Sequence, residues 1–306
     1  MFSRAFVRPV MVAAASGFAF KRKIARTSAS RYKHVSSVIL ETPVLSAAPI
    51  TSTTLAMGDW QGIIHIHDSN SRWTLEQLGP VRSIAKLTDD TFATSDQSRI
   101  CVWDIVHQKQ VREFGPERSA IISGMVGFPD GLLAVVRWGT ERIEVWDTNA
   151  GEMKWSLGGH ADDVKYITAL RHNRVASYGW DQKIRIWNLA NGECERVITS
   201  GYAGSLKALP DDTLVTTDLV GIKIWSDGAC VKEIKMRDIP WDPCMAITPD
   251  GKLLTNAFKT AFRVVDPATN DTEDIYSFLC PEDIVCMQDG RVITFGPGRI
   301  MDVFTL

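Results

Sequence analysis

The chain has 306 residues, 45% of them hydrophobic, and is long enough to bury a large core in one or two domains. A net charge of −2 argues against a general nucleic-acid binder, which usually presents a basic surface. No apolar run reaches the roughly 18 residues of a membrane span, so we expect none. The six cysteines are scattered without a CxxC pair, which predicts reduced thiols rather than a disulfide framework.

Residues 1–33 differ in composition from the rest of the chain. They carry eight Lys or Arg residues, and no acidic residue occurs before Glu41. This Arg- and Ser-rich, acid-poor composition predicts a mitochondrial transit peptide, which can contact an anionic membrane surface as a basic amphipathic helix. Two alternatives stay open: a secretory hydrophobic region at 10–20, although Lys21-Arg22-Lys23 follows it, or a basic docking arm of a cytosolic protein.

A short motif with alternating apolar residues recurs along residues 34–306. Its full form is Ile184 to Trp187, inside the longer unit GHADDVKYITALRHNRVASYGWDQKIRIWN, which begins at Gly159. The spacing between copies runs from 36 to 43 residues, and seven copies emerge. The anchor residues that end or lie within the copies are His67, Trp103, Trp146, Trp187, Trp225, Val265 and Val303. Period-2 alternation predicts that each copy is a half-buried strand.

A second apolar run precedes each anchor, and turn residues often lead into it, as at Pro129-Asp130-Gly131 and Pro249-Asp250-Gly251. Such pairs suit hairpins between antiparallel strands. The chain ends at Leu306, directly after the seventh anchor strand, so the seventh unit lacks an outer strand. We expect the strand-like segment 34–41 to fill that place, because an open edge would expose unpaired backbone groups.

The unit from Gly159-His160 to Trp187-Asn188 resembles a WD repeat, the sequence unit of one class of β-propeller blades. The resemblance implies an all-β fold: a seven-bladed propeller of four-stranded antiparallel blades, closed by the N-terminal strand. We therefore expect two regions, a basic extension at 1–33 and the propeller at 34–306. Most members of this family are platforms that bind other macromolecules, so the resemblance implies protein partners.

The same resemblance assigns a structural role to four polar residues that look catalytic. One blade of these propellers often holds a buried hydrogen-bond network, and its matching positions here are His160, Ser177, Asp181 and Trp187. No catalytic motif or phosphate-binding loop stands out elsewhere, so we predict no catalytic residues and no cofactor. His65 and His67 share a strand face but lack further ligands, so no metal site is predicted.

The predicted binding face lies at the turns between the second and third strands of the blades, the interaction-rich side in this family. A gap-free alignment at the anchors places Trp60, Gly139, Trp180 and Phe258 at one equivalent position. It places Gly58, Arg137, Tyr178 and Asn256 at a second, two residues earlier. Aromatic residues and Arg are enriched in binding hot spots. The predicted partner-binding residues are Trp60, Arg137, Tyr178, Trp180, Trp241, Asn256 and Phe258.

Three functions remain open at this point. The first is a non-catalytic protein-interaction scaffold, as a subunit of a mitochondrial multiprotein complex. The second is a cytosolic adaptor that recognises a peptide or ubiquitin. The third is a propeller enzyme, because fold alone does not decide function. An enzyme requires convergent acids, histidines or metal ligands at the channel mouth, whereas the predicted face carries aromatic residues, Arg and small residues, which favours the scaffold.

Overall fold

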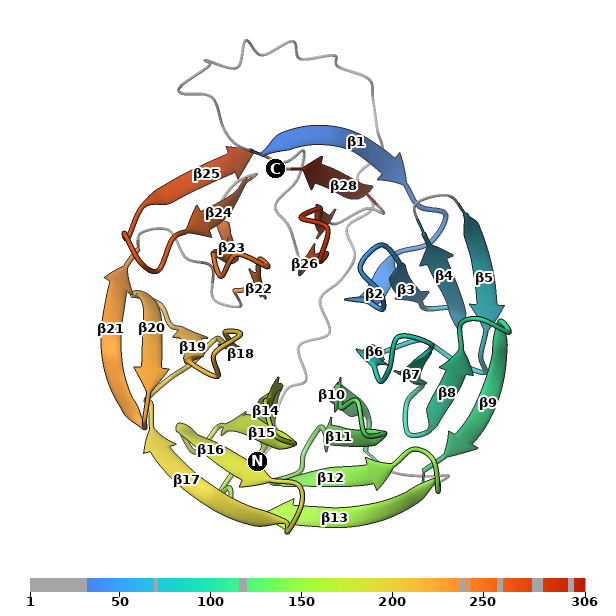
Figure 1. Cartoon of the computed structure of the whole chain (residues 1–306), viewed down its shortest axis with the longest axis horizontal. Coiled ribbons are helices and arrows are strands. Elements are labelled where there is room, and N and C mark those ends of the chain that lie inside the picture. The colour runs from blue at the N-terminus through green and yellow to red at the C-terminus, as the bar shows by residue number, and fades with distance from the viewer. Residues whose placement is uncertain are drawn as a thin grey trace, which may run out of the picture. The chain divides into compact units, whose positions relative to one another are not determined.

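The computed structural model describes residues 32–68, 71–115, 120–236, 240, 243–257, 261–276, 283–296 and 300–305. The chain divides into two units, Met1–Ser30 and Arg31–Leu306, and every described residue belongs to the second. The described strands form seven antiparallel four-stranded sheets, which follow one another around a ring (Figure 1). The predicted all-β, seven-bladed propeller is confirmed.

The first four blades follow one pattern, with the strands in chain order from the centre to the rim (Figure 1). Blade one contains β2 (Val44–Pro49), β3 (Leu55–Asp59), β4 (Ile63–His67) and β5 (Arg72–Glu76). Blade two contains β6 (Ser83–Lys86), β7 (Thr91–Ser95), β8 (Ile100–Asp104) and β9 (Lys109–Phe114). Blade three contains β10 (Ile122–Gly127), β11 (Leu132–Arg137), β12 (Arg142–Asp147) and β13 (Glu152–Gly158). Blade four contains β14 (Val164–Leu170), β15 (Arg174–Gly179), β16 (Lys183–Asn188) and β17 (Glu193–Thr199).

The last three blades repeat this order, except that the final outer strand comes from the start of the described chain. Blade five contains β18 (Ser205–Ala208), β19 (Leu214–Thr217), β20 (Gly221–Ser226) and β21 (Ala229–Lys235). Blade six contains β22 (Met245–Ile247), β23 (Leu253–Ala257), β24 (Ala261–Val265) and β25 (Thr272–Tyr276). Blade seven contains β26 (Asp283–Cys286), β27 (Val292–Gly296), β28 (Ile300–Thr305) and β1 (Lys33–Ile39).

The two recurring apolar runs of the sequence are the second and third strands of the blades. In β4 the side chains of Ile64 and Ile66 are buried, while the intervening His65 is partly exposed. Every residue of β3 and β11 is buried, because a second strand is covered on both faces by neighbouring blades. A strand buried on both faces reads as a continuous apolar run, which is why these segments lack alternation.

The hydrophobic core lies between the blades and falls into seven clusters, one at each junction of adjacent blades. Between blades three and four, for example, Leu157 packs in one cluster with Val175 and Trp187. Each fully buried aliphatic side chain contributes about 1.5–3 kcal/mol relative to exposure. No blade therefore has a complete core of its own, and the stability of the ring depends on closure.

The ring closes through β1, which pairs antiparallel with β28 from Lys33 opposite Thr305 to Ile39 opposite Ile300. Ser37 donates a 2.6 Å hydrogen bond from its hydroxyl to Asp302 Oδ1 on the facing strand. The junction of blades seven and one has its own cluster, in which Met57 packs with residues of β27 and β28. The predicted closing strand is confirmed.

Antiparallel blades give the ring two different faces. We call one the tryptophan face; it is formed by the turns between second and third strands and by the connections from one blade to the next. Hydrogen bonds join these two sets of segments, as from Val81 N to Asp59 O (2.9 Å) and from Trp180 N to Asp163 O (2.9 Å). We call the opposite face the funnel face; it is formed by the other two turns of each blade.

Candidate partner-binding face

A buried hydrogen-bond network connects the turn of blade four to its strands. His160 Nδ1 lies 2.9 Å from Asp181 Oδ1, and His160 Nε2 lies 2.8 Å from Ser177 Oγ. The indole Nε1 of Trp187 donates to the same Ser177 oxygen at 2.8 Å. Arg185 adds an ion pair to Asp181 at 2.8 Å. The structure thus brings together all four residues that the sequence assigns to the network.

Burial sets the protonation states in this network. Burial lowers the pKa of His160 below its usual 6.5, and this effect outweighs the hydrogen bond and charge of Asp181. Burial raises the pKa of Asp181, but hydrogen bonds from His160 and Ala161 N bring the net value below the usual range. A neutral imidazole fits the geometry, because it can donate from Nδ1 to the carboxylate and accept at Nε2 from the hydroxyl.

The Ser177–His160–Asp181 series has the composition of a hydrolase triad, but its geometry serves another purpose. The Ser177 side chain is fully buried, and its oxygen is occupied by both the imidazole and the Trp187 indole. The Asp181 carboxylate also accepts hydrogen bonds from Ala161 N, in the connection that enters blade four, and from Lys183 N, at the end of the turn. The network therefore fixes the backbone of the turn that carries Trp180.

Two further blades keep part of this network, which the sequence did not reveal. In blade two, Trp103 Nε1 donates to Thr94 Oγ1 at 2.7 Å, and Thr94 in turn donates to Gln77. In blade five, Trp225 Nε1 donates to Thr216 Oγ1 at 2.9 Å. A threonine in the place of Ser177, nine residues before the tryptophan instead of ten, is the signal that could have identified them.

Three of the predicted binding residues are buried behind the tryptophan face. Tyr178 is fully buried, and its hydroxyl accepts a hydrogen bond from Ala203 N at 3.0 Å, which ties blade four to the connection that enters blade five. Burial raises the pKa of this phenol. Arg137 is 2% exposed and Asn256 is 6% exposed. Their side chains support the face rather than form its surface.

Arg137 is a clamp between blades two and three. Its guanidinium pairs with Glu144 through two hydrogen bonds of 2.9 and 3.0 Å. It also donates to the carbonyl oxygens of Ser98 and Ala120. A planar guanidinium suits such bidentate pairing, and here it neutralises a carboxylate between two blades.

The gap-free alignment of the turns is wrong in blade three, because the turn there is one residue longer than in blade four. Val136 pairs with Ile143 as Tyr178 pairs with Ile184, which leaves six turn residues in blade three and five in blade four. The position of Trp180 is therefore taken by Trp138, and Gly139 follows it. Both tryptophans donate their backbone N–H at 2.9 Å to the residue before the inner strand, which supports this equivalence.

Three exposed indoles consequently lie at the same turn position of three blades. Trp60 is 52% exposed, Trp138 is 69% exposed and Trp180 is 45% exposed. Other exposed apolar side chains on the same face extend this set in blades one and five. We call the whole set the apolar arc: Trp60, Leu78, Trp138, Trp180, Leu219 and Val220.

Basic side chains lie over two of the indoles. The Arg82 guanidinium lies 5.1 Å from the ring centre of Trp60, and Lys165 Nζ lies 4.6 Å from that of Trp180. Cation–π attraction of this kind favours particular ring orientations. The predicted binding residues Trp241 and Phe258 lie outside the described residues.

A search of the described part of the chain for three or more clustered His, Cys, Asp or Glu residues that could hold a metal finds no group. Across the same residues, no helix has the length and apolar character needed to cross a membrane.

The closed ring of seven four-stranded blades is a β-propeller, and blade four holds the hydrogen-bond network that the repeat resemblance implied. The fold is similar to the crystal structure of the WD40 β-propeller domain of Doa1, with a TM-score of 0.72 over 90% of this chain and 97% of that one. Sequence identity to that domain is 12%, so the likeness shows the fold alone.

Curated relatives match part of the sequence. The chain is 24% identical over 190 residues to Protein tipD of Dictyostelium discoideum, which covers 59% of this chain and 30% of that protein. It is 24% identical over 183 residues to the DENN domain and WD repeat-containing protein SCD1 of Arabidopsis thaliana, which covers 55% of this chain and 15% of that protein. The chain thus matches less than a third of either relative. No family model matches it.

Proposed function

We propose that this protein is a non-catalytic scaffold that binds a partner protein through the apolar arc of its tryptophan face. The observation that carries this proposal is the repeated exposure of Trp60, Trp138 and Trp180 at one turn position. Tryptophan is among the residues that contribute most binding energy at protein interfaces. An exposed indole repeated at the equivalent turn of three blades is not a random scatter of surface apolar residues, and this repetition favours a binding role.

The structure holds the backbone at two of these tryptophans and places a cation over the ring of Trp60 and of Trp180, which lowers the entropic cost of binding. The backbone of Trp138 and of Trp180 is hydrogen-bonded to the neighbouring segment, and the turn of Trp180 is further fixed by Asp181. A rigid aromatic side chain loses little freedom when a partner covers it. These features support a preformed docking surface.

We further propose that the partner belongs to a mitochondrial multiprotein complex. The Arg- and Ser-rich, acid-poor composition of residues 1–33 supports import. The same apolar arc would serve a cytosolic adaptor for a peptide or ubiquitin. The N-terminal mass of the protein recovered from fractionated cells separates the two: a processed protein in mitochondria supports import, and an intact Met1 in the cytosol contradicts it.

The experiment that tests the docking face is a comparative affinity isolation with quantitative mass spectrometry. The test variant carries Trp60→Ala, Trp138→Ala and Trp180→Ala together. The matched control carries Val111→Ser, Met153→Ser and Val197→Ser, which replace side chains of similar exposure on the outer strands. We expect a set of partners that the control retains and the test variant loses. Equal recovery with both variants would contradict the proposal.

A further inference from the structure

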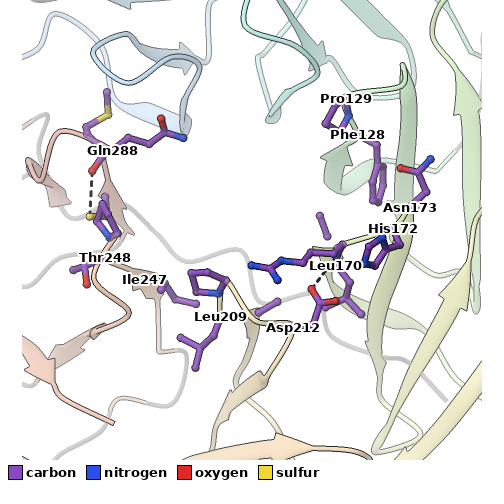
Figure 2. Close-up of a pocket in the computed structure, with 18 residues that line it drawn as sticks. Phe128, Pro129, Leu170, His172, Asn173, Leu209, Asp212, Ile247, Thr248 and Gln288 are labelled. Carbon is purple, nitrogen blue, oxygen red and sulfur yellow. Dashed lines mark hydrogen bonds between the residues drawn. The ribbon is translucent and has the colours of Figure 1, made fainter. Parts of the chain in front are cut away.

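The funnel face holds a large hollow at the centre of the ring. Its volume is about 910 Å³, which is in the range of about 300–1,000 Å³ typical of ligand sites. The turns between first and second strands of blades three to seven line it, and Figure 2 shows their side chains around the hollow. Much of the lining is apolar: Phe128, Pro129, Leu170, Leu209, Pro210, Ile247, Pro249 and Met287.

A groove of about 320 Å³ between blades four and five continues this hollow toward the rim. Leu170 and Asp212 line both spaces, so the hollow and the groove share a wall; we call the two together the track. Asp212 also fixes the walls, because its carboxylate accepts hydrogen bonds from Arg171 N at 2.8 Å and from Arg174 at 2.7 Å. A preformed track of this shape suits an extended chain better than a compact small molecule.

Some aspartates along the track are paired with an arginine, and others are not. Asp212 pairs with Arg174, and Asp227 lies 3.7 Å from Arg196. Asp211 lines the groove and accepts a hydrogen bond from Thr213 N–H. Asp130 follows the lining residue Pro129 at the edge of the hollow and accepts a hydrogen bond from the side-chain amide of Asn173, which also lines it. Arg171, which lines the hollow, is opposite to them in sign, and its positive charge helps to lower the pKa of Asp211.

The funnel face as a whole adds to this negative charge. Its described turn residues include eleven aspartates and three Lys or Arg residues, a net charge of −8. Lys86, Arg174 and Arg196 of the blade strands pair with three of these aspartates, and their three positive charges reduce the net charge from −8 to −5. Such a field steers cationic partners toward the face and disfavours acidic ones. The residues counted are Asp68, Asp89, Asp90, Asp130, Asp211, Asp212, Asp227, Asp250, Asp266, Asp271 and Asp289, with Arg171, Lys252 and Arg291.

We propose that the hollow and its groove bind an extended peptide segment of a partner protein in which Lys or Arg side chains alternate with apolar ones. The apolar side chains enter the hollow against Leu170, Leu209 and Ile247, while the basic side chains meet Asp130 and Asp211 at its edge. This site lies on the face opposite the apolar arc, so the scaffold can hold two partners at once.

The test selects short peptides from a random display library on the full chain and measures the enriched peptides by fluorescence anisotropy. The test variant, Asp130→Asn with Asp211→Asn, removes two charges and keeps both hydrogen-bond acceptors. The matched control, Asp89→Asn with Asp90→Asn, makes the same charge change on the same face, in a turn of blade two of which no residue lines the hollow or the groove.

We expect enrichment of peptides with Lys or Arg between apolar residues. Their affinity should fall about tenfold in the test variant, the effect of two weakened ion pairs of somewhat under 1 kcal/mol each, and stay within about twofold in the control. Failure to enrich any peptide, enrichment of acidic or uncharged ones, or equal losses in both variants would overturn the proposal.

Two further variants distinguish a basic peptide in the hollow from an acidic segment in the hollow and from a peptide on the apolar arc. Arg171→Ala should leave the affinity for basic peptides unchanged or raise it, whereas a loss would assign the hollow to an acidic segment. The triple tryptophan variant should bind the same peptides as the wild type. Peptide binding that disappears with the tryptophans would place the peptide on the apolar arc instead, so this proposal and the docking function fail separately.

Discussion

Replacing Ser177 by alanine removes one buried oxygen atom that has two buried partners. The Ser177 hydroxyl lies 2.8 Å from His160 Nε2 and accepts the Trp187 indole N–H at 2.8 Å. All three side chains are at least 95% buried, so water cannot replace the lost bonds. A buried polar group left without a partner costs about 1–3 kcal/mol. Two such groups predict a loss of about 2–6 kcal/mol in the free energy of unfolding.

The matched comparison is Thr216→Val in blade five, which keeps the shape of the side chain. There the hydroxyl accepts a single indole N–H, that of Trp225, so one orphaned group predicts a loss of about 1–3 kcal/mol. Urea unfolding followed by circular dichroism measures both free energies. We expect Ser177→Ala to lower the free energy of unfolding by clearly more than Thr216→Val does. Equal losses, or a smaller one for Ser177→Ala, would refute the account of the network.

Two further predictions concern stability. Burial, aided by the positive charges of Arg72 and His65, lowers the pKa of His67 to about 4. The unfolded chain therefore binds more protons between pH 6.5 and 4, and the free energy of unfolding should fall on acidification across that window. Urea titrations at pH 6.5 and at pH 4 measure this fall in the free energy of unfolding, and His67→Phe should make the fall smaller by about 1–3 kcal/mol. An unchanged pH dependence in the variant would contradict the assignment to His67. Arg137→Met should cost about 1–3 kcal/mol, because Glu144, whose side chain is 23% exposed, loses its cation and keeps the Trp146 indole N–H as a donor. Arg99→Met, at a partly exposed pair, should cost less than about 1 kcal/mol. Thermal unfolding that ranks the two variants equally would contradict the role of Arg137 as a clamp.

The repeat architecture could be predicted from the sequence because every blade buries the equivalent strand faces against its neighbours. A third strand must present alternate side chains such as Ile64 and Ile66 to a neighbouring blade, and that requirement leaves a visible period. Closure by the segment 34–41 followed from counting strands. The network of His160 could also be located, because the resemblance fixes the position of each member.

The surface was harder to predict, because it depends on turn length and side-chain direction. One additional residue in the turn of blade three moved Trp138 into the exposed position that a gap-free alignment gives to Gly139. Tyr178 lies within β15 and is buried in the core, whereas Trp180 comes after the end of that strand, in the turn, where strand alternation no longer sets the side-chain direction. The hollow of the funnel face combines turns from five blades, and no local pattern marks such a site.

The most direct test of the central claim is the dissociation constant between the isolated partner and this protein, measured by isothermal titration calorimetry. The variant with alanine at Trp60, Trp138 and Trp180 is compared with the wild type, after urea unfolding has shown that both are equally stable. Hot-spot residues contribute about 2 kcal/mol or more each, so we predict that the triple variant binds at least about 100-fold more weakly. An affinity within about twofold of the wild type would show that the apolar arc is not the docking surface.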